Sequence, residues 1–201
     1  MAPKLCILVL SFVFTTTISL ASSPTASTST KTSSSTELIR SYCEDAVFPR
    51  LCNKVFRKHA EIIHPNGTTE LTQLATVVTV NRLRGLSKRV AALAREADGS
   101  KDAKALKGCK DALGDAAKEA RRSAAESADL KPTTSKPKAE KQVAKAQAYM
   151  SNALSNEDLC ADELEGMADG PVKTDVSRRV RQVKQLTANS LSLIHGVATA
   201  N

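Results

Sequence analysis

The chain has 201 residues, a formal net charge of +8 and an aromatic content of 3%, with no tryptophan. The strands of β-sandwiches favour β-branched and aromatic side chains, so this Ala-, Lys-, Leu- and Ser-rich composition predicts an all-α protein of closely packed helices. The positive charge favours an acidic partner. The lack of aromatic stacking platforms argues against nucleic acid as that partner.

The first 21 residues have the pattern of a secretory signal peptide. Lys4 gives a positive start, residues 5–14 are apolar apart from one serine, and residues 19–21 offer small side chains for cleavage. A membrane-spanning helix needs about 20 mostly apolar residues, and the threonines at 15–17 interrupt this stretch. We therefore predict export, no membrane contact after cleavage, and a mature net charge of +7 because Lys4 is lost.

The next segment, residues 22–36, is a run of Ser, Thr, Ala and Pro with one lysine (SSPTASTSTKTSSST). It has almost no apolar surface to bury, so we expect a disordered leader. The ordered part then spans residues 37–199, which is long enough for one domain with a hydrophobic core.

Two short helical pieces, 37–43 and 51–63, surround a turn at Pro49 and predict a helical hairpin over residues 37–66. Asn66-Gly67-Thr68 ends the hairpin. The same three residues form an N-glycosylation sequon, so Asn66 is a predicted glycosylation site.

Four longer helical stretches follow within residues 67–199. Apolar or small residues recur three or four apart, or at multiples of that spacing, over 71–93, 106–124, 143–160 and 176–197. Turn residues at 98–100 and 169–171, and a Pro- and Lys-rich loop over 131–138, separate the stretches. Amphipathic helices with short connections pack as an up-down-up-down four-helix bundle, which is the predicted fold.

Four cysteines remain after Cys6 leaves with the signal peptide. In an oxidising compartment they indicate two disulfides, with three possible pairings. We predict Cys43–Cys52, because these residues flank the Phe-Pro turn, and Cys109–Cys160, because these would tie two long helical stretches side by side. No Cys-x-x-Cys spacing occurs and the histidines lie elsewhere, so we predict neither a metal nor a cofactor.

Motifs of common enzyme classes are missing from the sequence. It contains no Gly-rich phosphate loop, no nucleophile elbow and no His-Glu-x-x-His. Carboxylates near one another are expected by chance in a chain with 25% charged residues. We therefore predict a protein that binds another macromolecule and is not an enzyme.

Four blocks together resemble the plant invertase and pectin methylesterase inhibitor family. They are YCEDAVFPRLC at 42–52, ALKGCKDALGDAAKEARRSAA at 105–125, AYMSNALSNEDLC at 148–160 and LTANSLSLI at 186–194. The blocks occur in the family's order, with its four cysteines. The resemblance covers residues 37–198 and implies a four-helix bundle behind a helical hairpin, with the two disulfides paired first to second and third to fourth.

The resemblance also implies a function in the plant apoplast or cell wall. Members inhibit invertases or pectin methylesterases through a reversible complex that covers the substrate cleft, and residues 151–158 look more like the pectin methylesterase branch. In that branch acidic residues after the third cysteine face the enzyme, which makes Asp111 and Asp115 interface candidates. Lys118 replaces a further acidic contact and Leu159 replaces a threonine, so both are candidates that depart from the pattern.

Two alternatives to a pectin methylesterase inhibitor stay open. The chain could inhibit a cell-wall or vacuolar invertase, because both branches share the four blocks. It could also be a basic cell-wall protein that binds acidic pectin directly, since residues 131–145 contain five lysines.

Overall fold

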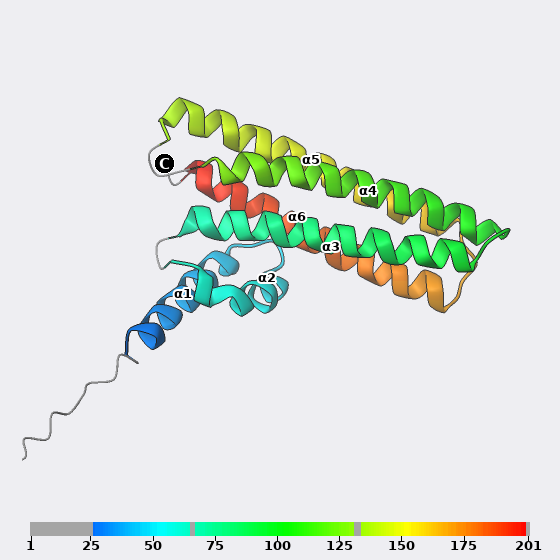
Figure 1. Cartoon of the computed structure of the whole chain (residues 1–201), viewed down its shortest axis with the longest axis horizontal. Coiled ribbons are helices and arrows are strands. Elements are labelled where there is room, and N and C mark those ends of the chain that lie inside the picture. The colour runs from blue at the N-terminus through cyan, green and yellow to red at the C-terminus, as the bar shows by residue number, and fades with distance from the viewer. Residues whose placement is uncertain (1–25, 65–66, 131–133, 200–201) are drawn as a thin grey trace, which may run out of the picture.

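A computed structural model describes residues 26–64, 67–130 and 134–199. All regular structure in these ranges is helical: α1 (Ala26–Glu44), α2 (Pro49–Phe56), the 3-10 helix η1 (Arg57–Ile62), α3 (Thr68–Glu96), α4 (Lys101–Ala128), α5 (Lys136–Glu165) and α6 (Pro171–Thr199). Figure 1 shows α3 to α6 as four long helices side by side, each running opposite to the next, with α1 and α2 beside one end. The predicted all-α bundle behind a helical hairpin is confirmed.

The first helix is longer than the sequence predicted. α1 begins at Ala26, so residues 26–36 are helical where we expected a disordered leader. Helix extension from a packed segment adds one hydrogen bond per residue without a new nucleation cost, which explains why a Ser- and Thr-rich stretch can continue the helix. Residues 22–25 and the predicted signal peptide at 1–21 lie outside the described residues.

The packed segment that supports α1 lies at its C-terminal end. Ile39 is buried in the core of the hairpin, and the buried Ser35 hydroxyl donates a hydrogen bond to the carbonyl of Ile63 at 2.5 Å. The predicted disulfide between Cys43 and Cys52 is present and joins α1 to α2. The hairpin shares its apolar cluster with the bundle, through Leu71 and Ala75 on α3 and Leu186 and Leu193 on α6.

One buried amide attaches the hairpin to the bundle. Asn189 on α6 accepts the Phe48 N–H through Oδ1 at 2.8 Å and donates through Nδ2 to the Phe48 carbonyl at 3.0 Å. A side-chain amide matches both groups of a backbone residue, so the turn before α2 has a fixed position on α6. Pro49 then begins α2, where its missing N–H costs nothing.

The bundle packs most closely around α4. The inward positions of α4 are mostly small, including Ala116 and Ala120, and α3 and α5 both contact α4 more extensively than either contacts α6. A Cβ added at Gly108 would lie 2.5 Å from the Glu163 carboxyl carbon, which shows how near α5 approaches. The second predicted disulfide, Cys109–Cys160, joins α4 to α5 and is also present.

Two helix boundaries differ from the predicted ones. α5 begins at Lys136, inside the predicted loop over 131–138, because a proline in the first helical turn replaces an N–H that would be unpaired anyway. The predicted helix 51–63 is divided into α2, which ends at Phe56, and η1. None of the helices in the described ranges has an apolar stretch long enough to cross a membrane.

Candidate functional site

The three interface candidates on α4 lie together on its exposed face. Asp111 and Asp115 are one helical turn apart, with side chains 58% and 57% exposed. With Lys118 they border a shallow depression of about 460 Å³, which Ser87 on α3 also lines. The structure therefore brings these predicted residues together at the seam between α3 and α4.

Both carboxylates on this face have a lysine neighbour on the same helix. Lys110 pairs with Asp111, and Lys118 Nζ lies 2.7 Å from Asp115 Oδ1. Exposed ion pairs contribute only about 0–1 kcal/mol, so cations of a partner can replace these lysines at small cost. At position 118 the resemblance implies a further negative charge. This chain has a lysine there, and its positive charge neutralises Asp115.

Leu159 does not belong to this depression. It lies on α5 with 55% of its surface exposed, next to the disulfide-bonded Cys160. A single exposed leucine is ordinary on a protein surface. Leu159 is therefore not among the residues that line the depression, and its role at an interface stays a prediction.

Two other predicted features fall partly or wholly outside the described residues. Asn66 and Lys131 are not described, so glycosylation stays a prediction. The remaining lysines of the basic tract, Lys136, Lys138, Lys141 and Lys145, lie on α5. Within the described ranges, no group of three or more His, Cys, Asp or Glu side chains could hold a metal ion.

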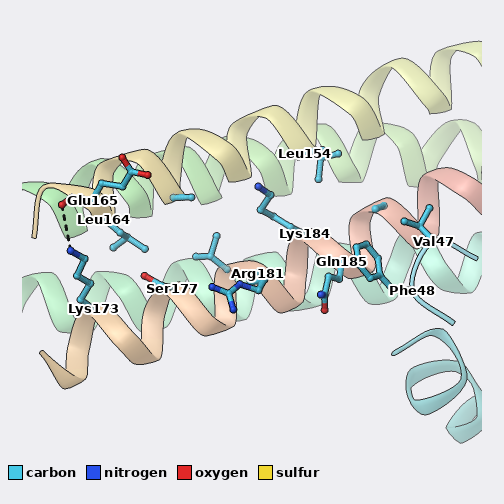
Figure 2. Close-up of a pocket in the computed structure, with 13 residues that line it drawn as sticks. Val47, Phe48, Leu154, Leu164, Glu165, Lys173, Ser177, Arg181, Lys184 and Gln185 are labelled. Atoms are coloured by element: carbon cyan, nitrogen blue, oxygen red, sulfur yellow. Dashed lines mark hydrogen bonds between the residues drawn. The ribbon is translucent and has the colours of Figure 1, made fainter. Parts of the chain in front are cut away.

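A groove between α5 and α6 was not predicted from the sequence. It has a volume of about 680 Å³ and an apolar lining that includes Val47 and Phe48 near the hairpin and Leu154 and Leu164 on α5. Figure 2 shows these side chains with the basic residues that α6 adds, Lys173, Arg181 and Lys184. The groove follows from the less extensive contact between α5 and α6, compared with the tight packing around α4.

A buried carboxyl group lies in the same helix pair. Glu157 on α5 is fully buried, and the Thr187 hydroxyl on α6 donates to its Oε1 at 2.6 Å, while its Oε2 has no partner among the described residues. Burial raises the pKa of Glu157 to about 8, against the opposing effects of the Thr187 hydrogen bond and the Lys184 charge. The group is neutral at mildly acidic pH and lines none of the grooves described here, so it is a structural group.

Residues 37–193, most of the chain, match the sequence family described as "Plant invertase/pectin methylesterase inhibitor". The chain belongs to this inhibitor family. Pectinesterase inhibitor 3 of Arabidopsis thaliana is 28% identical to this member over 162 residues, which cover 79% of the chain and 78% of the relative. Pectinesterase inhibitor 9 of the same plant is 28% identical over 169 residues, which cover 83% of each.

Solved structures of inhibitors from the same plant share the fold of this family member. Mutant form A of a pectin methylesterase inhibitor from Arabidopsis aligns with a TM-score of 0.60 and 16% identity, over 76% of this chain and 92% of that one. A second Arabidopsis pectin methylesterase inhibitor aligns with a TM-score of 0.55 and 14% identity, over 79% and 95%. The family and the two sequence relatives are inhibitors and not enzymes, which agrees with the sequence analysis.

Proposed function

We propose that this chain is a secreted inhibitor of pectin methylesterase that forms a reversible one-to-one complex and blocks the pectin-binding cleft of the enzyme. The observation that carries the proposal is the placement of Asp111 and Asp115 on one exposed face of α4. Both sequence relatives are named pectinesterase inhibitors, which favours pectin methylesterase over invertase as the target.

The packing of α4 suits it to present a fixed surface. Its buried face consists largely of small residues packed against α3 and α5, and the Cys109–Cys160 disulfide holds it to α5. A surface already held in its binding shape loses little conformational entropy on association, so more of the contact energy appears as affinity. In the complex the exposed carboxylates contact basic groups of the enzyme. These contacts replace the ion pairs that the carboxylates form with Lys110 and Lys118.

The test is a titration of purified pectin methylesterase with the mature chain at mildly acidic pH. Demethylation should stop near one molar equivalent. The charge-reversed variant Asp111→Arg with Asp115→Arg should bind about 30-fold more weakly or worse, because reversing two contact charges costs about 2 kcal/mol or more. Glu140→Arg, an exposed charge reversal on α5, is the matched control and should inhibit like the wild type.

Three outcomes would change the proposal. Full enzyme activity at a several-fold molar excess of the chain would refute it. Undiminished inhibition by the double variant would remove α4 as the contact face. A parallel assay of sucrose hydrolysis addresses the invertase alternative, since inhibition of invertase alone would make that branch the correct one. Secretion is tested separately by sequencing the N-terminus of the exported chain, which should begin at Ser22.

A further inference from the structure

A second groove lies on the hairpin side of the bundle, where α2 and η1 face α3 and α6. Its volume is about 460 Å³. Fifteen described residues line it, of which five are Lys or Arg and none is Asp or Glu. The five cations are Lys54, Lys58, Arg82, Arg89 and Arg179. This lining makes the groove a strongly positive concave surface, and such a surface attracts anions.

Three of the five cations are available to a ligand. Lys54, Lys58 and Arg82 are exposed, and none of them has an ion pair or a side-chain hydrogen bond within the part of the chain that the structure describes. Lys54 and Lys58 come from the hairpin side and Arg82 from α3. The positive charge therefore faces the groove from both of its walls.

The other two cations share a single carboxylate. Arg89 on α3 and Arg179 on α6 lie 2.8 and 2.9 Å from Asp175, which Arg178 also contacts at 2.6 Å. Hydrogen bonds from Arg179 and Arg89 hold the pKa of Asp175 well below its ordinary value, so the carboxylate is charged. One negative charge cannot balance three guanidinium groups, and this end of the groove stays positive as well.

The spacing of the cations favours an extended ligand. Arg82 and Arg89 are seven residues apart on α3, which corresponds to about 10 Å along the helix. A single phosphate or carboxylate cannot contact both of them together with the lysines on the opposite wall. The lining contains no Phe, Tyr or Trp side chain, and its single imidazole, His59, offers no series of platforms on which successive nucleic-acid bases could stack. A flexible, non-aromatic polyanion fits this arrangement best.

The remaining lining can receive sugar units. Asn81 and Gln182 are exposed amides that can donate to and accept from hydroxyl groups, and Leu51, Val55 and Val78 provide an apolar surface for C–H faces. Gly85 also lines the groove, one helical turn after Asn81 on α3, and a Cβ built there would meet no atom within 4 Å. Packing therefore does not require a glycine at this position, and glycine is a poor helix former. The missing side chain leaves the groove open.

We propose that this groove binds a chain of uronate units, that is, de-esterified pectin. Uronates supply carboxylates for the five cations, hydroxyls for the two amides and C–H faces for the apolar lining. The choice of this polyanion rests on the proposed function, since an inhibitor of pectin methylesterase works beside the carboxylates that the enzyme releases from their esters. The binding itself uses none of the residues of the α4 face.

The test compares polygalacturonate with one polymer that has the same backbone without the charge, and with one that has the same charge on a different backbone. The mature chain is titrated by calorimetry with polygalacturonate, with fully methyl-esterified pectin and with polyglutamate, each at low and at raised salt. We expect binding to polygalacturonate that weakens as salt rises, and no binding to the esterified polymer, because screening and esterification both remove the charge attraction. Absence of binding to polygalacturonate would overturn the proposal, and equal binding to polyglutamate would assign the groove to acidic peptides.

Matched variants locate the binding on the molecule. Replacing the three available cations (Lys54→Gln, Lys58→Gln and Arg82→Gln) should weaken polygalacturonate binding about tenfold or more, because each cation lost removes one salt-dependent contact. Replacing three lysines of the basic tract on α5 (Lys138→Gln, Lys141→Gln and Lys145→Gln) removes the same charge and should change the affinity less than about twofold. Equal losses in both variants would refute the groove as the site.

A third variant blocks the groove without changing its charge. Gly85→Leu adds an apolar side chain where a Cβ meets open space, so it should fold with an unchanged or higher melting temperature and still lose affinity for polygalacturonate. Undiminished binding by this variant would contradict the proposal. The groove variants should inhibit pectin methylesterase like the wild type, so failure of pectin binding and failure of inhibition can be told apart.

Discussion

The substitution Glu157→Gln tests the buried carboxyl between α5 and α6. Glutamine has nearly the same shape, and its carbonyl oxygen can still accept the Thr187 hydroxyl, which lies 2.6 Å from Glu157 Oε1. Unlike a carboxyl group, the glutamine side chain cannot release a proton. The variant therefore removes the titration of this group and leaves the packing of the fully buried site in place.

The sign of the effect follows from the raised pKa. The carboxyl has its ordinary pKa of 4.5 in the unfolded chain and a pKa of about 8 in the folded chain, so between these values only the folded state holds the proton. The stabilisation is complete below pH 4.5 and is lost as the pH rises through about 8. Each pH unit in this window lowers the free energy of unfolding by about 1.4 kcal/mol, which amounts to about 5 kcal/mol in total.

Glu157→Gln should therefore be as stable as the wild type, within about 1 kcal/mol, near pH 4.5. Near pH 7.5 it should be more stable by about 4 kcal/mol, which for a domain of this size raises the melting temperature by about 10 °C. Asp175 contributes in another range, because its lowered pKa gives stability that is lost only as the pH falls below its ordinary value of 3.8.

The measurement is reversible urea unfolding followed by circular dichroism from pH 4.5 to 8, with the disulfides intact. Glu140→Gln, at an exposed position of the same helix, is the matched control and should keep the wild-type slope. If the wild type showed no loss of stability across this range, or if Glu157→Gln retained the same loss, the assignment of a neutral buried carboxyl would be wrong.

Three further variants test how the structure is held together. Asn189→Ala removes both hydrogen bonds to Phe48 and should cost about 1–3 kcal/mol, with faster proteolysis of the hairpin than of the bundle. Replacing Cys109 and Cys160 together by serine opens a loop with a sequence separation of 51 and should lower the unfolding free energy by about 4 kcal/mol in urea. Ala116→Leu overfills the buried face of α4 and should lower the melting temperature, at a cost of about 1–3 kcal/mol.

The pattern along α5 shows what the sequence can predict. The spacing of Met150, Ala153 and Cys160 predicted one inward face, and all three side chains are buried. Glu157 lies four residues after Ala153 and three before Cys160, so the same spacing places it inside. The spacing alone thus indicates a buried position, although a carboxylate is normally expected at the surface, so position and residue type give opposite indications here.

The positive groove could not be predicted in this way. Its lining comes from residues 51–59, 78–89 and 179–186, and no local pattern connects these segments. Their relative position depends on the apolar packing of the hairpin against α3 and α6, and on the hydrogen bonds between Asn189 and Phe48. The block at 186–194 was recognised as a resemblance, and the structure gives a physical reason for the asparagine within it.

The two proposed binding surfaces lie on different sides of α3. Ser87 borders the depression with the α4 carboxylates, whereas Gly85 and Arg89 line the positive groove. Residues two apart on an α-helix are about 200° apart around its axis, so α3 separates the two surfaces. A pectin chain in the groove would therefore leave the α4 face open. If both proposals hold, the inhibitor can stay attached to de-esterified pectin while α4 binds an enzyme that acts on the ester groups nearby.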